Sequence, residues 1–208
     1  NGDLVHKMYL ELTTADNWTV PNPGSSLITS VELEIGGQLI DRHYGHWMET
    51  WSELTQSNNY GVVCKEDGTL NQTEFQRLSG MGGIADTATA HDRIFVPLYF
   101  WFCRNPGLSL PLIALQYHEV KVILEHLIDT VSGGAQTNTL WCDYIYLDTD
   151  ERRRFAQVSH EYLIEQVQRH SSSISISENL NFNHPVKELV WIIRSISANT
   201  PVTTALVP

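Results

Sequence analysis

Two histidines and a glutamate recur at intervals of three residues and carry side chains of the kind that bind metal ions. His43, His46 and Glu49 lie in residues 43–54, where aromatic and aliphatic side chains recur every three or four positions, as on one face of a helix. The zinc-protease motif requires two histidines four residues apart with a glutamate beside the first, and steps of three drift around a helix. The spacing therefore favours an ordinary amphipathic helix over a metal site.

A glycine-rich stretch has the spacing of a dinucleotide-binding fingerprint. Gly80, Gly82 and Ala85 match that fingerprint in form. The fingerprint binds pyrophosphate only where a strand runs into the N-terminus of a helix. Residues 75–78 do not have the pattern of a central parallel strand, so we interpret the match as chance.

Two other stretches begin like metal-binding motifs and fail at one residue each. Residues 118–119 open like the zinc-protease motif, but Val122 stands where the second histidine belongs. The acidic residues from Asp148 open like a calcium loop, but Arg152 stands where that loop needs Asp or Asn. The sequence therefore predicts no catalytic, cofactor-binding or metal-binding residue.

A run of three arginines follows directly on a run of acids. Arg152, Arg153 and Arg154 come after Asp150 and Glu151. One interpretation is a solvated turn with local ion pairs, each worth at most about 1 kcal/mol. The other is a contact between subunits, because Arg binds carboxylates bidentately and is enriched at interfaces. Both interpretations stay open.

Two asparagines and three cysteines carry groups that can be modified. Asn17 and Asn71 begin glycosylation sequons, which matter only for a chain that enters the secretory pathway. Cys64, Cys103 and Cys142 are odd in number and far apart, so they form neither a disulfide framework nor a zinc-finger spacing. We expect buried free thiols in a reducing compartment.

The composition of the chain excludes some classes of partner. The 208 residues carry a formal net charge of −11, from 13 Lys and Arg against 24 Asp and Glu. Such an acidic surface argues against sequence-independent binding of nucleic acid, which depends on a basic face. Charged residues make up 18% and aromatic residues 10%, against about 25% charged in an average soluble domain. This balance suits a protein that covers much of its surface with other protein.

Most of the remaining sequence alternates with the period of two that is typical of β-strands. Residues 36–37 are a Gly-Gly pair between two such runs and predict a hairpin. Residues 57–92 are polar and rich in glycine and predict a long surface loop. The sequence lacks a regular alternation of strands and helices, so we predict an antiparallel all-β protein, a sandwich or jelly roll, with short helices in its loops. The expected strands are residues 4–12, 27–35, 38–41, 118–125, 139–147 and 188–195. The apolar run 94–102 begins as a buried strand, and Pro97 marks an edge or bulge in it.

Blocks of sequence spread over nearly the whole chain resemble the major capsid protein of the nucleocytoplasmic large DNA viruses. That group includes viruses of algae, iridoviruses and the mimivirus-like giants. The strings FWFCRNPGL and YLDTDERRRFA are especially specific. Residues 58–91 match least well, as expected of a variable loop. The matching blocks are residues 1–10, 31–44, 47–49, 96–118, 144–166 and 182–191.

The resemblance implies a double jelly roll, in which one chain forms two eight-stranded sandwiches. It places most of a first jelly roll at residues 1–168, a linker at 169–184 and the start of a second jelly roll at 185–208. The resemblance also suggests an internal fragment, because family members carry further strands before the first block and most of a second jelly roll after the last.

The function implied by the resemblance is structural. Three chains would form a pseudo-hexagonal capsomer, and capsomers would tile an icosahedral shell around a viral genome in the virion, after assembly in the host cell cytoplasm. The expected partners are the chain itself as a homotrimer, neighbouring capsomers and minor capsid proteins. No direct, sequence-specific contact with nucleic acid is expected, and an underlying internal membrane would be reached through other proteins.

Two alternatives from other classes stay open at this point. Jelly rolls also occur in lectins, and the six tryptophans suit a carbohydrate-binding β-sandwich with a row of exposed aromatic side chains. A β-sandwich glycosidase would need two carboxyl groups within about 5–10 Å of each other in a cleft. The matched strings favour the capsid protein.

Overall fold

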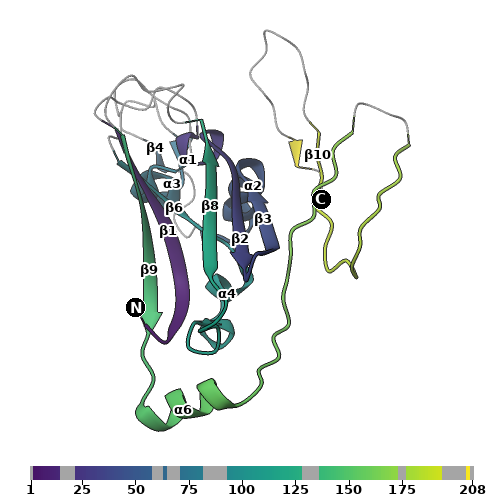
Figure 1. Ribbon diagram of the computed structural model, residues 1–208. Coiled ribbons are helices and arrows are strands. Elements are labelled where there is room, and N and C mark those ends of the chain that lie inside the picture. The colour runs from purple at the N-terminus through teal and green to yellow at the C-terminus, as the bar shows by residue number, and fades with distance from the viewer. Residues whose placement is uncertain are drawn as a thin grey trace. The chain divides into compact units, whose positions relative to one another are not determined.

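The protein is described by a computed structural model that covers residues 2–14, 22–57, 63–64, 71–81, 93–127, 136–172, 177–193 and 205–206. Short helices interrupt a fold made mostly of strands (Figure 1). The elements are β1 (Leu4–Thr14), α1 (Pro23–Ser26), β2 (Ile28–Ile35), β3 (Gln38–Tyr44), α2 (Gly45–Thr55), β4 (Val63–Cys64), β5 (Asn71–Gln72), α3 (Glu74–Ser79), β6 (Arg93–Pro97), α4 (Trp101–Arg104), the 3-10 turn η1 (Pro106–Leu108), β7 (Leu110–Pro111), β8 (Val120–His126), β9 (Gln136–Ile145), α6 (Thr149–Gln157), β10 (Ile192–Ile193) and β11 (Ala205–Leu206).

The chain divides into two compact units, Asn1–Val167 and Gln168–Pro208. The first unit holds two larger antiparallel sheets, the short antiparallel pair β4-β5 and every helix of the described residues. In the described part of the second unit, regular structure is limited to the pair of short strands β10 and β11, which are antiparallel.

The first sheet is built around β1, which pairs with three other strands. Along one edge β1 pairs with β9 from Leu4 to Thr14, with a bulge between Val5 and Met8. Along its other edge β1 pairs with β6 and then with β7. Figure 1 shows β1 and β9 running side by side, although they come from opposite ends of the first unit. Every pairing is antiparallel, as predicted.

The second sheet has the order β3-β2-β8, again antiparallel throughout. Strands β2 and β3 form the hairpin that the Gly-Gly pair predicts. Gly36 and Gly37 have φ values of 59° and 81°, which side chains other than glycine rarely adopt. The hairpin prediction is confirmed.

The two sheets enclose one hydrophobic core between them. Alternate residues of β1 and β2 point into it, because successive side chains of a strand face opposite sides of the sheet. Its largest fully buried side chains include Phe100 and Phe102, which lie at and beside the short helix α4. Other members are Val5, Met8, Leu10, Leu12, Ile28, Val31, Leu33, Met48, Ile94 and Val96.

Helix α2 follows β3 directly and packs closely on α1. The residue at the junction is Gly45, where an added Cβ would meet the backbone carbonyl oxygens of Ser25 and Ile28. Only glycine therefore allows this approach of the two backbones. Met48 is the fully buried side chain of the helix.

The structure makes one sequence prediction more exact and corrects two others. The apolar run 94–102 is a strand only up to Pro97, because proline cannot continue a β-ladder; the chain then turns into α4. Residues 57–92 are not all surface loop, since Met81 is fully buried in the core and the described part includes helix α3. In residues 188–195, only Ile192–Ile193 form a strand among the described residues, because they are the ones that pair with β11.

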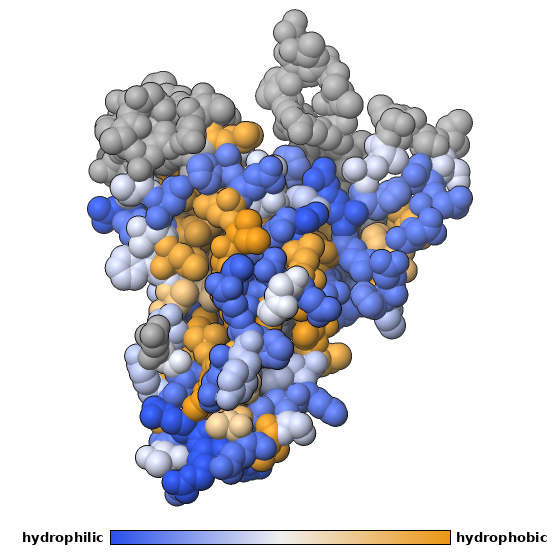
Figure 2. All heavy atoms as spheres, in the orientation of Figure 1, coloured by the Kyte–Doolittle hydropathy of each residue, from blue (hydrophilic) through white to orange (hydrophobic). Residues whose placement is uncertain are grey.

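One side of the first unit leaves core-facing side chains partly exposed. Among the described residues, β9 pairs with β1 alone and β8 pairs with β2 alone. Leu140 and Tyr144 of β9 stand opposite the buried Leu10 and Val5, yet each is 39% exposed. Figure 2 shows hydrophobic side chains reaching the surface where β1, β8 and β9 lie in Figure 1.

Candidate interaction surfaces

The outer face of the first sheet carries aromatic side chains in register across three strands. Tyr9 of β1 stands between Trp141 of β9 and Pro97 of β6. Two residues along β1, Glu11 stands between Thr139 and Phe95 in the same way. Trp141 is 50% and Phe95 36% exposed. This row is thus apolar surface on the side of the sheet that faces away from the core.

The polar atoms of this face bind one another. The Trp141 indole donates to a Glu11 carboxylate oxygen at 2.6 Å, and Arg93 lies 3.0 Å from the other oxygen of the same carboxylate. The Tyr9 hydroxyl donates to Asp143 at 3.0 Å, and this hydrogen bond raises the pKa of Tyr9. Glu11 and Asp143 are therefore already bound within the chain.

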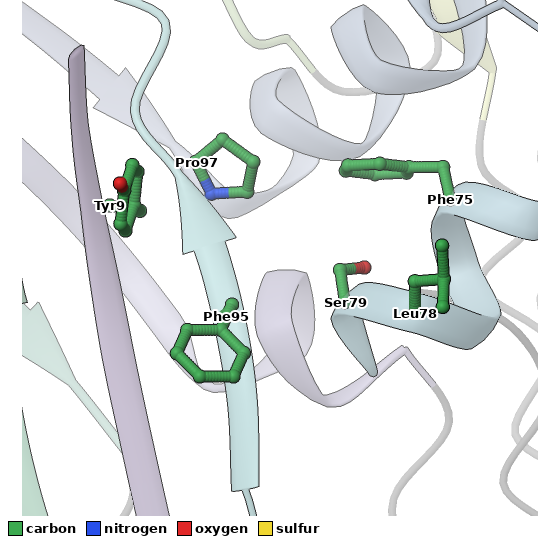
Figure 3. A pocket seen from close by; sticks show the side chains of 6 residues that line it. All are labelled: Tyr9, Phe75, Leu78, Ser79, Phe95 and Pro97. Atoms are coloured by element: carbon green, nitrogen blue, oxygen red, sulfur yellow. The ribbon is translucent and has the colours of Figure 1, made fainter.

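A pocket of about 350 Å³ opens next to this row, between the sheet and helix α3 (Figure 3). Tyr9, Phe95 and Pro97 form its wall on the sheet, as Figure 3 shows, and α3 supplies the opposite wall. The one hydroxyl from α3 belongs to Ser79, which accepts a hydrogen bond from the backbone of Met81. The lining residues are Tyr9, Phe75, Leu78, Ser79, Phe95 and Pro97.

Helix α3 is held firmly although it has only six residues. Thr73 and Gln76 form a capping box at its N-terminus, and Gly80 ends it with a left-handed conformation. The Gln76 side chain also donates to Glu53 of α2. Leu78 nevertheless points out and is 70% exposed. The pocket is thus preformed and has an exposed leucine on its rim.

The arginine run lies in helix α6, and its three members have different surroundings. Arg152 pairs with Asp3 at 2.9 Å, and Asp3 also accepts from the backbone of Leu147 at 2.8 Å. The Leu147 hydrogen bond and then Arg152 lower the pKa of Asp3. Arg153 lies 3.8 Å from the exposed side chain of Asp150. Arg154 is exposed to solvent. Arg152 therefore ties α6 to the start of β1 within one chain.

Residues 161–167, here called the strap, extend from the region after α6 back to the second sheet. They form neither helix nor strand. Glu165 pairs with Arg104, whose guanidinium lies 4.3 Å from the Trp51 ring centroid. Gln166 donates to the backbone carbonyl of Ile40. These contacts attach the strap beside β3 through side chains rather than through a β-ladder.

The last residue of the strap binds a buried carboxylate. The Asp41 side chain is 1% exposed, and one of its oxygens accepts from the backbone N–H groups of Arg42 at 2.9 Å and Val167 at 3.0 Å. The other oxygen lies 2.8 Å from Nε2 of His43. The His43 ring stacks on Phe100, with centroids 4.7 Å apart. Asp41 is thus the polar centre of the strap's attachment.

The structure separates the three residues that suggested a metal site. His43 belongs to strand β3 and faces the core, because α2 begins only at Gly45. His46 is exposed on α2. Glu49 accepts a hydrogen bond from Ser25 at 2.7 Å, and burial raises its pKa. Throughout the described ranges, no group of three His, Cys, Asp or Glu side chains is placed to hold a metal ion.

Two other motif-like stretches have structural roles. Gly80 ends α3 instead of opening a helix, and Gly82 and Ala85 lie outside the described residues. Asp148 caps α6, where its side chain accepts from the Glu151 N–H at 2.8 Å. No helix in the described part of the chain is long and apolar enough to cross a membrane.

The cysteines and sequons are placed only in part. Cys103 and Cys142 are free thiols. Burial raises the pKa of Cys103 to about 12 and raises that of Cys142 as well. The Cys64 side chain and Asn17 lie outside the described residues, and Asn71 begins β5.

Comparison with known proteins identifies the family of the chain. A family model described as "Major capsid protein N-terminus" matches residues 1–148. The chain belongs to this family. A second model, "Large eukaryotic DNA virus major capsid protein", matches residues 151–205. The predicted resemblance to these major capsid proteins is confirmed.

Two curated relatives show how close this membership is. The major capsid protein of Pyramimonas orientalis virus is 50% identical over 206 residues, which cover 92% of this chain and 50% of the relative. The major capsid protein of Paramecium bursaria Chlorella virus 1 is 42% identical, over 92% of this chain and 46% of the relative. The chain therefore spans about half the length of these major capsid proteins.

A solved structure of this capsid protein family confirms the fold class. The crystal structure of PBCV-1 VP54, fitted into a cryo-EM reconstruction of the virophage Sputnik, matches with a TM-score of 0.60 and 38% identity. The match covers 80% of this chain and 41% of that chain. The predicted antiparallel jelly-roll sandwich is thus confirmed.

Sequence reasoning missed both the pocket and the strap attachment. The pocket combines residues from β1, α3 and β6, which lie far apart in sequence. Asp41 appeared only as the end of a predicted strand. Its one usable signal was a charged residue on the core-facing side of an alternating run, where an unpaired charge is costly.

Proposed function

We propose that this chain is part of a structural building block of a viral shell. In this proposal the protein forms homotrimeric, pseudo-hexagonal capsomers, and the capsomers tile the icosahedral capsid of a large DNA virus. The observation that carries it is 50% identity to a major capsid protein over 92% of this chain. The structural match to PBCV-1 VP54, with a TM-score of 0.60 and 38% identity, also supports it.

The proposed organisation is the one expected from the resemblance. Residues 1–168 form the first jelly roll, 169–184 a linker and 185–208 the start of a second jelly roll. The division of the chain into compact units after Val167 supports the first of these boundaries.

The proposal gives the protein no catalytic activity, cofactor or metal. Its partners are copies of itself, neighbouring capsomers and minor capsid proteins, and it makes no sequence-specific contact with nucleic acid. Any internal membrane is reached through other proteins, and assembly takes place in the host cell cytoplasm before the protein resides in the virion. The net charge of −11 supports a shell that encloses nucleic acid without binding it.

Oligomeric state tests the proposal. The protein, expressed from its complete coding sequence, is expected to elute as a trimer in size-exclusion chromatography with light scattering. Negative-stain electron microscopy should show particles with a pseudo-hexagonal outline. Monomers at micromolar concentration, with no such particles, would contradict the proposal.

A further inference from the structure

We propose that the strap guards the free edge of strand β3 against pairing with strands of other chains. Among the described residues, β3 pairs with β2 alone and ends the sheet order β3-β2-β8 (Figure 1). An edge strand presents unpaired backbone N–H and C=O groups, on which a strand of another chain can align. The strap, residues 161–167, is bound at this edge. The proposal concerns the fold of the first unit and does not depend on the capsid function.

Strand β3 carries a bulge at the place where the strap attaches. The register of β3 on β2 shifts between Leu39 and Asp41, so Ile40 between them has no partner in the ladder. A bulged residue is left unpaired and its backbone groups need other partners. The backbone carbonyl oxygen of Ile40 accepts a hydrogen bond from the side chain of Gln166. The strap thus binds the carbonyl of the residue that the bulge removes from the ladder.

Asp41 connects the strap to the backbone of the same edge strand. One of its carboxylate oxygens accepts from the N–H of Arg42 in β3 at 2.9 Å and from the N–H of Val167 in the strap at 3.0 Å. Hydrogen bonds to an ionised acceptor are roughly twice as strong as those between neutral groups. The carbonyl of Ile40 is therefore bound by the strap directly, and the N–H of Arg42 is bound by an oxygen that the strap shares.

The strap covers the edge without becoming a strand itself. Its residues form no ladder with β3, and Gln166 binds that strand through its side chain. Glu165 pairs with Arg104, whose guanidinium lies 4.3 Å from the Trp51 ring centroid. An added strand would present a new row of unpaired backbone groups, whereas a segment held by side chains presents no such regular row. The sheet therefore ends at the strap.

Strand β3 combines three features that natural sheets use to protect an edge. These are a bulge, a charged side chain that points inward and a loop that covers the strand. The bulge is at Ile40, the inward charge is Asp41, whose side chain is 1% exposed, and the cover is the strap. A buried carboxylate is costly unless it is hydrogen-bonded, and here its hydrogen bonds hold the cover in place. Edge protection explains all three features together, whereas a strap that only added stability would leave the bulge unexplained.

Two substitutions in the strap should release it without changing β3. In the protein from its complete coding sequence, Gln166→Ala removes the donor to Ile40, and Val167→Pro removes the N–H that binds Asp41. Proline suits this position because the residue before it prefers an extended conformation. The loss of both hydrogen bonds should raise the detached fraction of the strap about tenfold or more.

Proteolysis measures whether the strap is released. Cleavage after Glu165 by a glutamyl endopeptidase follows the detached fraction, so it should accelerate by the same factor in the double variant. Gln116→Ala is the matched control, because the Gln116 side chain also donates to a backbone carbonyl, that of Ile113 at 2.8 Å; this variant should be cleaved after Glu165 at the wild-type rate. A double variant cleaved at the wild-type rate would overturn the proposal, because these two contacts would then not hold the strap.

Aggregation distinguishes edge protection from simple stabilisation. At a temperature where circular dichroism shows the double variant still folded, it should form thioflavin-positive aggregates about tenfold faster or more than the wild type. Adding Leu39→Lys should restore the wild-type rate, since lysine on an edge strand opposes pairing and Leu39 of β3 is 49% exposed. Leu78→Lys adds the same charge on α3, where Leu78 is 70% exposed, and should not restore it.

Two results of the aggregation assay would also overturn the proposal. If the double variant is cleaved faster but aggregates at the wild-type rate, the edge of β3 is closed without the strap. If Leu39→Lys and Leu78→Lys suppress aggregation equally, added charge rather than the edge of β3 controls aggregation.

Discussion

Replacing Asp41 by alanine is expected to destabilise the first unit and release the strap. The substitution removes the acceptor of two backbone N–H groups, those of Arg42 and Val167, and leaves the His43 ring beside an empty space. An unsatisfied buried donor costs about 1–3 kcal/mol.

Two such donors lose their acceptor, so we expect a loss of about 2–6 kcal/mol in the free energy of unfolding. Against a typical net stability of about 5–15 kcal/mol this is a large fraction. For a unit of this size it corresponds to a fall in melting temperature of about 4–24 °C. Differential scanning calorimetry measures this fall directly.

Two variants separate the charge of Asp41 from its hydrogen bonds. Asp41→Asn keeps an oxygen that can accept from Val167 and Arg42 but removes the negative charge beside His43. Its free energy of unfolding should therefore fall less than that of Asp41→Ala. Asp150→Ala is the control, because the Asp150 side chain is 94% exposed and its removal should change little. Hydrogen exchange should show that the Val167 amide loses protection in Asp41→Ala. A loss below about 1 kcal/mol, with Val167 still protected, would refute this account of the strap.

Three further predictions concern other parts of the first unit. Gly45→Ala should cost at least about 1–3 kcal/mol, because its Cβ would meet two backbone carbonyl oxygens; a wild-type melting temperature would contradict this. Iodoacetamide at pH 8 should alkylate Cys142 faster than Cys103, whose pKa is raised to about 12 by burial, and peptide mass spectrometry showing equal rates would argue against it. Arg152→Ala should raise the pKa of Asp3. The lowered pKa of Asp3 gives stability that is present above its unfolded value of 3.8 and is lost as the pH falls through the folded value. The difference in melting temperature between the variant and the wild type should therefore vanish in acid, and a difference that persists there would show that Arg152 acts in another way.

The local signals in the sequence predicted those elements whose pattern is self-contained. The Gly-Gly hairpin and the amphipathic helix α2 depend on neighbours a few residues away, and both are present. Residues 188–195 have an equally strong strand pattern. A pattern specifies which face a strand can bury, but the strand forms only where a partner supplies its hydrogen bonds. Among the described residues, that partner is limited to Ala205–Leu206.

The pocket and the strap attachment were hidden for a related reason. The pocket joins Tyr9, Leu78 and Phe95, and the strap attachment joins Asp41 to Val167. Neither set has a short-range spacing that could mark it. The family resemblance was visible in contiguous strings, whereas each of these surfaces exists only once distant segments have paired.

The pairing of β1 with β9 has a consequence for the order of events during synthesis. Tyr9 and Asp143, which bind each other across these strands, are 134 residues apart. At a translation rate of about 5–20 residues per second, β1 waits roughly 7–27 s on the ribosome before its main partner is made. Until β6 is made, β1 has no strand of its sheet to pair with, and neighbouring ribosomes on one messenger hold identical unpaired strands close together. We therefore expect the nascent chain to bind chaperones through β1, and its folding to be limited by the arrival of β9 rather than by any local element.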